Sequence, residues 1–302
     1  MEFCLIYNNL SGRNKARKIA LKVKSELERL FFRVSVFDIQ HKKDALEHVE
    51  QATKNDLNRP VNVVVFGGDG TVSSVVTQFK NCLQKVCFSV YPCGTANDFA
   101  IEHKFPKNIK KFTKILISQK LKSIDLIDAN GKIVVHAVGA GHFTNGSANF
   151  NAKRKKIFGR FAYYFKCAML TLKLNSARLK IEFDKKETLT DNFLFYYVIN
   201  TKLAGGFKRF SKGTVYDDGI VEFVGVKKCG FFSFLWLVLK IFLGCSQNCK
   251  QIIRRKSSNI NVEVLSENKE FENLDLDGEC EGQHPLNIKV LNKKMLLKDT
   301  KK

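Results

Sequence analysis

The chain has 302 residues, with 51 Lys and Arg against 29 Asp and Glu, which gives a formal net charge of +22. A hydrophobic fraction of 44% with only 19 Gly and 4 Pro excludes a disordered, collagen-like or proline-rich protein. The length corresponds to about two domains. A basic globular protein of this kind binds polyanions, which include nucleic acid, anionic lipid and phosphorylated substrates.

The first part of the chain alternates the patterns of short buried strands and amphipathic helices. Strands are predicted at 3–7, 34–37, 61–66 and 86–90, and helices at 15–31, 43–52 and 71–83. Because helices connect parallel strands in this order, we expect an α/β domain with a doubly wound sheet over residues 1–124. Ligands of such sheets bind at the carboxyl ends of the strands.

From about residue 125 the pattern changes to strands with few helices between them. Strands are predicted at 133–138, 178–183, 194–199, 220–226, 261–265 and 286–291, and a helix near 158–174. We therefore expect a β-rich domain over residues 125–280. A C-terminal segment, 281–302, is expected to return toward the first domain.

The apolar segment Phe231–Leu243 is too short to span a membrane and contains Lys240. Two interpretations remain open for it. It is either a helix packed in the core or a helix whose apolar face dips into a lipid surface.

The cysteines and histidines show no spacing typical of a disulfide framework or a zinc site. Nine Cys occur at irregular intervals and no Cys-x-x-Cys is present. The N-terminal apolar run stops at Asn8, which is too short for a signal peptide. We expect reduced thiols that serve as small apolar fillers in a cytoplasmic protein.

The strongest chemical signal is a glycine loop between a predicted strand and a predicted helix, formed by Gly67, Gly68, Asp69, Gly70 and Thr71. Glycines let the backbone approach a phosphate closely, and a helix N-terminus attracts anions. An acidic side chain inside such a loop indicates a Mg²⁺ ion that bridges to nucleotide oxygens. The alternative is an ordinary glycine turn with a solvated carboxylate.

Two further turns follow predicted strands at the same edge of the sheet. The first is formed by Asn8, Asn9, Leu10, Ser11 and Gly12. The second, at 94–100, offers Thr95 for a phosphate hydrogen bond and Asn97 or Asp98 as a helix cap. The second turn alone is typical of a cap, but beside the glycine loop it favours a phosphate-binding crevice.

Two acidic turns occur later in the chain. The carboxylate of Glu279, in Asp277-Gly278-Glu279, is a candidate base for a hydroxyl that receives a phosphoryl group, provided that the chain returns to the crevice. The alternative is a solvated turn. Asp217-Asp218-Gly219 is a turn by default and a candidate cation site.

Together these motifs resemble the diacylglycerol kinase catalytic-domain family, particularly its soluble bacterial lipid kinases. The other matching segments are 156–164, 205–207 and 217–219, and all occur in family order. The resemblance implies an N-terminal Rossmann-like nucleotide domain, a C-terminal β-sandwich domain and a lipid bound in the cleft.

The resemblance also implies roles for particular residues. ATP phosphates are expected on residues 8–12 and 67–71, with Thr95 as a further nucleotide contact. Asp69, Asp98 and Asp125 match acidic residues important for activity and Mg²⁺ placement, and Glu279 matches the proton acceptor. A structural Mg²⁺ site is implied at the side chain of Asp218 with the carbonyls of Val215 and Ile220.

Three positions depart from the family pattern. Ser73-Ser74 stand where an Asn-Glu pair is usual, Asn9 stands where the first turn usually has Pro, and Ile39 stands where a Thr is common. The missing carboxylate at Ser74 predicts an altered nucleotide affinity.

The sequence therefore predicts an ATP- and Mg²⁺-dependent lipid kinase whose expected acceptor is diacylglycerol, with phosphatidic acid as product. The alternatives are a kinase of a soluble substrate such as NAD and a non-catalytic binder of anionic membranes. The positive charge, including Lys153–Lys156 beside the aromatic residues of 158–165, favours peripheral association with the inner membrane face. No nucleic-acid motif is found, and a homodimer is left open.

Overall fold

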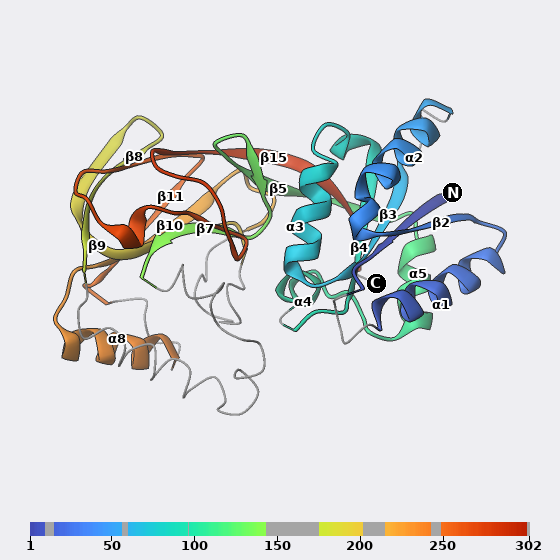
Figure 1. Cartoon of the computed structure of the whole chain (residues 1–302), viewed down its shortest axis with the longest axis horizontal. Coiled ribbons are helices and arrows are strands. Elements are labelled where there is room, and N and C mark those ends of the chain that lie inside the picture. The colour runs from blue at the N-terminus through green and yellow to red at the C-terminus, as the bar shows by residue number, and fades with distance from the viewer. Residues whose placement is uncertain are drawn as a thin grey trace. The chain divides into compact units, whose positions relative to one another are not determined.

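The computed structural model describes residues 1–9, 15–55, 60–95, 97–142, 175–201, 215–242 and 249–300. The chain forms two compact units, which Figure 1 shows in colours that follow the chain. The first unit consists of Met1–Leu126, Tyr216–Asp218 and Leu291–Lys302, and the second of Ile127–Val215 and Gly219–Val290.

The first unit is built on a parallel sheet. Its strands are β1 (Glu2–Tyr7), β2 (Arg33–Asp38), β3 (Val61–Gly67) and β4 (Val86–Pro92), in the order β4-β3-β1-β2. Every residue of β3 and β4 is buried, as expected for central strands covered on both faces.

The described part of this unit contains the helices α1 (Ala16–Glu28), α2 (Lys42–Asn55), α3 (Asp69–Gln78), α4 (Asp98–Glu102) and α5 (Ile109–Ile117). Short 3-10 turns lie at η1 (Ile39–His41) and η2 (Leu83–Lys85). The buried residues of α1 recur at helical spacing, and they are Ala16, Ala20, Val23 and Leu27.

Two predicted helices are shorter than expected. The helix predicted at 15–31 ends at Glu28, because the chain turns at Phe31 with a positive φ of 62°, and Leu30 is therefore exposed rather than buried. The helix predicted to reach residue 83 ends at Gln78, and η2 follows it.

The second unit is dominated by antiparallel strands. They are β6 (Lys132–Val134), β7 (Ala137–Gly141), β8 (Ala177–Phe183), β9 (Glu187–Ile199), β10 (Val221–Lys227), β11 (Ile252–Ser257), β12 (Asn259–Val264), β13 (Asp275–Leu276) and β14 (Glu279–Cys280). Among the residues described, this unit also contains helix α8 (Phe231–Phe242) and the 3-10 turn η5 (Lys269–Phe271).

Strand β9 organises this unit because its two halves have different neighbours. Its first half pairs with β8, and its second half pairs with both β7 and β10. The core is rich in aromatic rings, and Tyr196 stacks at 5.6 Å between ring centroids on Phe223.

Two strands contribute to both units. Strand β5 (Leu121–Ala129) begins in the first unit, and its last residues pair with β6 in the second. Strand β15 (Leu286–Lys298) pairs antiparallel with β12 at its start, and Leu296 and Leu297 pair parallel with β4 near its end.

The predicted fold class, a doubly wound α/β domain with a C-terminal β-sandwich, is confirmed. Some individual strands differ. The single strand predicted at 133–138 is divided into β6 and β7, because the N–H groups of Val135, His136 and Ala137 donate to the carboxylate of Asp277. Strands β5 and β11 were not predicted, and in β11 the three consecutive basic residues 254–256 hide the apolar pattern.

Candidate functional site

Three loops of the first unit lie together at the carboxyl ends of β1, β3 and β4. The N–H of Asn8, after β1, donates to the carbonyl of Phe66 at 3.1 Å. The N–H of Cys93, after β4, donates to the carbonyl of Gly67 at 2.9 Å. The structure therefore brings the predicted glycine loop next to the other two strand ends.

Gly68 and Gly94 allow two of these loops to touch through their backbones. A Cβ added to Gly94 would lie 2.5 Å from the Cα of Gly68, and a Cβ added to Gly67 would lie 2.4 Å from the Cβ of Thr71. No larger residue fits at Gly94 unless the loops separate. The glycines therefore serve the approach of one loop to the other, besides leaving backbone accessible to a ligand.

Thr71 lies inside this arrangement. Its Oγ1 accepts a hydrogen bond from the Nδ2 of Asn8 at 3.1 Å, and the residue is only 7% exposed. The ten-residue helix α3 begins at Asp69, so its free N–H groups lie within the glycine loop. A helix N-terminus in a glycine loop is suited to an anionic group such as a phosphate.

Asp69 connects the glycine loop to the next one. Its Oδ1 accepts a hydrogen bond from the N–H of Phe99 at 3.0 Å, in the first turn of α4. The prediction that Asn97 or Asp98 caps this helix is wrong for Asn97, whose side chain makes no helix-capping bond. Its amide instead closes the turn with the N–H and carbonyl of Gly94, each at 2.7 Å.

The other predicted residues of this edge are placed as follows. Thr95 and Asn9 are exposed, Gly70 lies in the first turn of α3, and Asp98 is the half-buried first residue of α4. Leu10, Ser11 and Gly12 lie outside the described residues.

The departure at Ser74 has a partner on a neighbouring helix. The Nζ of Lys42, in α2, donates to the Oγ of Ser74, in α3, at 2.7 Å. A basic side chain therefore contacts the position at which the resemblance predicts a carboxylate. The Ser74 hydroxyl accepts the hydrogen bond of the Lys42 ammonium group but supplies no negative charge.

Asp125 is fully buried in β5 and bonds to two backbone groups. Its N–H donates to the carbonyl of Tyr216 and its Oδ1 accepts from the N–H of Lys293, both at 2.7 Å. The ring of Tyr216 also contacts His103, with 5.0 Å between centroids. These bonds tie the 216–218 turn and β15 to β5 within the first unit.

The candidate cation turn that follows is exposed at Asp218 and turns through Gly219, whose φ is 75°. Among the described residues there is no cluster of three or more His, Cys, Asp or Glu side chains suited to a metal. A cation at this turn would therefore depend on backbone carbonyls. The expected ligands are the side chain of Asp218 and the carbonyls of Val215 and Ile220. Hard cations such as Mg²⁺ accept such oxygen ligands.

Glu279 stands in the second unit on a two-residue hairpin. Asp277 and Gly278 turn the chain with φ values of 54° and 92°, typical of the Asp-Gly turn that connects two antiparallel strands. Glu279 itself is exposed and pairs with Leu276 across the hairpin. An exposed carboxylate on a rigid hairpin is suited to meet a substrate.

Asp277 fixes this hairpin to the rest of the unit. Its two carboxylate oxygens accept three backbone hydrogen bonds, from Val135 and His136 at 2.8 Å and from Ala137 at 3.0 Å. The sequence motif predicted a role for Glu279 alone, and the anchoring role of Asp277 was not predicted. Its signal is an Asp at the first position of an Asp-Gly turn.

Asp275 supports the same turn from inside. Its Oδ1 accepts the N–H of Gly278 at 2.7 Å. Burial raises the pKa of Asp275 to about 6, with the neighbouring charge of Asp277 acting in the same direction.

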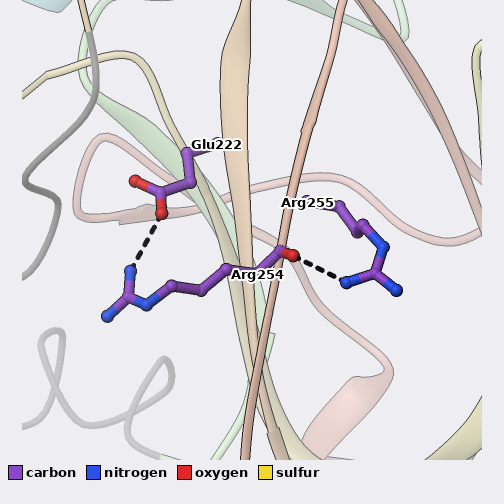
Figure 2. A network of polar contacts seen from close by, with 3 residues as sticks. All are labelled: Glu222, Arg254 and Arg255. Atoms are coloured by element: carbon purple, nitrogen blue, oxygen red, sulfur yellow. Dashed lines mark hydrogen bonds and ion pairs between the residues drawn. The ribbon is translucent and has the colours of Figure 1, made fainter. Parts of the chain in front are cut away.

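A second polar feature of this unit was not predicted. Figure 2 shows Glu222, on β10, facing Arg254, on β11, with 3.0 Å between Oε1 and Nη1. Glu222 is 7% exposed, so the ion pair is largely withdrawn from water. The available signal was a single acidic residue in a strand, Val221–Lys227, whose other residues before the terminal Lys227 are apolar or Gly.

Several sequence predictions cannot be placed. The basic and aromatic segment 153–165, the predicted helix 158–174 and the Gly205-Gly206-Phe207 motif lie outside the described residues. Among the described cysteines, all seven are free, and burial raises the pKa of Cys4 and Cys87 to about 12. Such thiols are apolar fillers rather than nucleophiles.

Comparison with known proteins agrees with this arrangement. Residues 2–129 match the family model of the diacylglycerol kinase catalytic domain. A diacylglycerol kinase of Bacillus subtilis is 27% identical over 282 residues, which are 93% of this chain and 90% of that protein. One of Staphylococcus haemolyticus is 25% identical, over 94% of this chain and 84% of that protein.

Solved structures show the same fold. The crystal structure of a diacylglycerol kinase from Bacillus anthracis aligns with a TM-score of 0.76 and 23% identity, over 99% of this chain and 96% of that one. An NAD kinase from Archaeoglobus fulgidus in complex with ATP aligns with a TM-score of 0.51 and 12% identity, over 100% of this chain and 94% of that one.

Proposed function

We propose that this chain is a kinase of the diacylglycerol kinase catalytic-domain family, whose model matches residues 2–129, and that it transfers the γ-phosphate of ATP to the hydroxyl of diacylglycerol. The product would be phosphatidic acid, and the enzyme would work at the inner face of the membrane. The observation that carries the nucleotide half of this proposal is the contact of the glycine loop with the turn after β4, through Gly68 and Gly94.

The ATP phosphates are proposed to bind at the N-terminus of α3. There the free N–H groups of the first turn face the glycine loop, and the loops after β1 and β4 flank it. Asn8 would orient Thr71, and Asn9, Leu10, Ser11, Gly12 and Thr95 would complete the nucleotide contacts. The N–H groups and the helix dipole favour the negative phosphates.

The nucleotide is expected to arrive as its Mg²⁺ complex. A carboxylate has about four lone-pair positions, so Asp69 can bond to Phe99 and still offer an oxygen to a cation. Asp98, the first residue of α4, would be the second carboxylate. The cation would neutralise charge on the phosphate oxygens.

Glu279 is proposed as the proton acceptor. As the lipid hydroxyl oxygen forms its bond to the γ-phosphorus, the bond from that phosphorus to the β,γ-bridging oxygen breaks, ADP leaves and the hydroxyl proton passes to the Glu279 carboxylate. The exposure of Glu279 supports this role, and the anchoring of its hairpin by Asp277 supports a fixed position for the carboxylate.

Asp125 and the Asp218 turn are proposed to act on structure. Asp125 would preserve the packing of β5 against β15 through its backbone bonds. Asp218, with the carbonyls of Val215 and Ile220, would hold a structural Mg²⁺. Addition of a chelator should then lower the thermal midpoint of the wild-type chain and leave that of Asp218→Asn unchanged.

The test is a transfer assay with labelled ATP on diacylglycerol in detergent micelles and, in parallel, on NAD. We expect labelled phosphatidic acid from the wild-type chain and essentially none from Glu279→Gln. Glu281→Gln is the matched control, because Glu281 is an exposed carboxylate close by that pairs only at the surface with Lys132. Labelled NADP without labelled lipid would overturn the proposal in favour of a soluble acceptor.

A further inference from the structure

Helix α8 carries an exposed apolar stripe formed by Phe232, Trp236 and Leu239. These side chains are 83%, 58% and 36% exposed, and their spacing of four and three residues places them on one side of the helix. Phe234 and Leu237 point to the other side and are each 2% exposed. Figure 1 shows α8 in orange at the periphery of the second unit.

The buried side of α8 explains why the stripe is held firmly. Phe234 and Leu237 belong to one apolar cluster with Leu194 on β9 and Val226 on β10. The helix is therefore fastened to the strands by one face while the other presents large apolar side chains to solvent. Exposed Trp, Phe and Leu on one face of a fixed helix indicate a surface that meets an apolar partner.

The charge around this helix identifies the kind of partner. Residues 227–256 contain Lys or Arg at seven positions and no Asp or Glu. Three of these basic residues, Lys227, Arg254 and Arg255, pair with the carboxylates of Asp191, Glu222 and Glu187 on neighbouring strands. Lys228, which precedes α8, and Lys250, which follows it in the chain, are exposed, and the N–H of Lys227, next to the first, donates to the carbonyl of Gln251, next to the second, at 2.8 Å. The Nζ of Lys240 lies 5.6 Å from the Trp236 ring centroid. An apolar stripe bordered by lysines fits an interface between acyl chains and anionic headgroups.

A second copy of the chain fits this surface less well. With a net charge of +22, and basic residues bordering the stripe, two copies facing each other would repel. No helix in the described part of the chain is long and apolar enough to cross a bilayer. The twelve residues of α8 extend about 18 Å, which suits a helix lying in the plane of the surface.

We propose that α8 docks the enzyme on an anionic lipid bilayer, with the stripe of Phe232, Trp236 and Leu239 inserted below the headgroups. Lys228, Lys240 and Lys250 lie over the anionic headgroups. This inference rests on the proposed function in one respect: an enzyme that phosphorylates a lipid must reach the membrane that contains it. The docking itself is measurable without catalysis.

The test uses Trp236, which is the single Trp of the chain and therefore a native reporter. On addition of phosphatidylglycerol vesicles we expect its fluorescence to shift to shorter wavelength and to be quenched by lipids brominated in the acyl chain. Phosphatidylcholine vesicles should bind at least about tenfold more weakly, because they lack the anionic charge. An unchanged emission in the presence of phosphatidylglycerol vesicles would overturn the proposal.

Two variants test the stripe and the lysines separately while keeping the reporter. Phe232→Ser with Leu239→Ser should weaken vesicle binding by about tenfold or more. Lys228→Glu with Lys250→Glu should also weaken vesicle binding by about tenfold or more, and should make the binding less dependent on salt concentration. Phe31→Ser is the matched control, since Phe31 is 97% exposed in the first unit, after the end of α1. Equal loss in this control would contradict a role for α8.

Two further outcomes separate this inference from others. A blue shift that grows with protein concentration in the absence of vesicles would indicate self-association and overturn the proposal. The wild-type chain and the Phe232→Ser, Leu239→Ser variant should phosphorylate a monodisperse short-chain diacylglycerol at equal rates. Diacylglycerol in vesicles should be phosphorylated more slowly by the variant than by the wild-type chain. If neither lipid is phosphorylated but the blue shift occurs, the proposed function fails and the docking stands.

Discussion

Asp277 determines where the Glu279 hairpin lies, because three backbone N–H groups donate to its carboxylate. Replacing Asp277 by Asn exchanges one accepting oxygen for an NH₂ group that would face the N–H of Val135. We expect a loss of about 1–3 kcal/mol in the free energy of unfolding. We also expect a fall in kcat of at least about tenfold, since a misplaced base is a poor proton acceptor.

The measurement is steady-state kinetics together with urea unfolding. KM for ATP should stay close to that of the wild-type chain, because the nucleotide loops belong to the other unit. Glu281→Gln again serves as the control on the same hairpin. A fall in kcat of the same size in Glu281→Gln would show that any charge change there is harmful.

His284 provides a pH dependence at the residue scale. Burial lowers the pKa of His284 from 6.5 to about 4, and its Nε2 lies 2.8 Å from the hydroxyl of Tyr196. In the unfolded chain the His284 imidazole binds a proton more readily than in the folded chain. The contribution of neutral His284 to the free energy of unfolding is therefore complete above pH 6.5 and is lost as the pH falls through about 4. The loss approaches about 3 kcal/mol at acid pH.

The measurement compares wild-type and His284→Gln unfolding across this pH range. The gap in stability between the two should shrink as the pH falls, since Gln does not titrate. Asp275 acts in the opposite direction, because its raised pKa of about 6 makes stability fall as the pH rises from 3.8 toward that value. It is present in both chains, so it cancels in the difference. A gap that is independent of pH would refute the role given to His284.

At the scale of elements, the glycine loop and the turn after β4 depend on each other, because their backbones touch at Gly68 and Gly94. A methyl group at Gly94 would lie 2.5 Å from the Cα of Gly68, so Gly94→Ala must push the two loops apart. We expect KM for ATP to rise by about tenfold or more, because the phosphate contacts depend on both loops.

The matched control is Gly230→Ala, because a Cβ at Gly230 meets no atom within 4 Å. Binding of ATP, followed by calorimetry, should be unchanged in this control. Retained ATP affinity in Gly94→Ala would argue against a nucleotide site at these loops.

The second element-scale prediction concerns the ion pair between β10 and β11. Removing only the charge of Glu222, as in Glu222→Gln, leaves the charge of Arg254 largely buried without the Glu222 carboxylate. We expect the free energy of unfolding to fall by about 3 kcal/mol. The double change of Glu222→Met with Arg254→Met should recover most of this loss, because both charges of the pair are then removed together. Chemical unfolding of the three chains decides between these outcomes.

At the scale of the whole molecule, the charge of +22 predicts a dependence on salt. Activity on diacylglycerol in phosphatidylglycerol vesicles should fall steeply as salt rises from about 0.1 M to about 1 M, where the Debye length shortens from about 10 Å to about 3 Å. Activity on a monodisperse short-chain diacylglycerol should change much less. Equal salt sensitivity in the two assays would assign the positive charge to nucleotide binding alone.

Most of the first unit could be predicted because its signals are local. Buried parallel strands are continuous apolar runs, and the glycine loop has its chemistry in consecutive residues. The strands of the second unit were harder, since β11 carries consecutive basic residues and β6 and β7 are separated by bonds to Asp277, more than a hundred residues away.

The sequence by itself determined the class of both units, the resemblance of residues 2–129 to a kinase family and the strongly basic composition, because these depend on composition, periodicity and short motifs. Only the tertiary structure decided that Asp69 caps α4, that Gly68 and Gly94 meet, that Asp277 holds the Glu279 hairpin and that the stripe of α8 is exposed. The physical reason is that each of these depends on contacts between segments far apart in the chain, and no local pattern encodes which distant backbone group a side chain will meet.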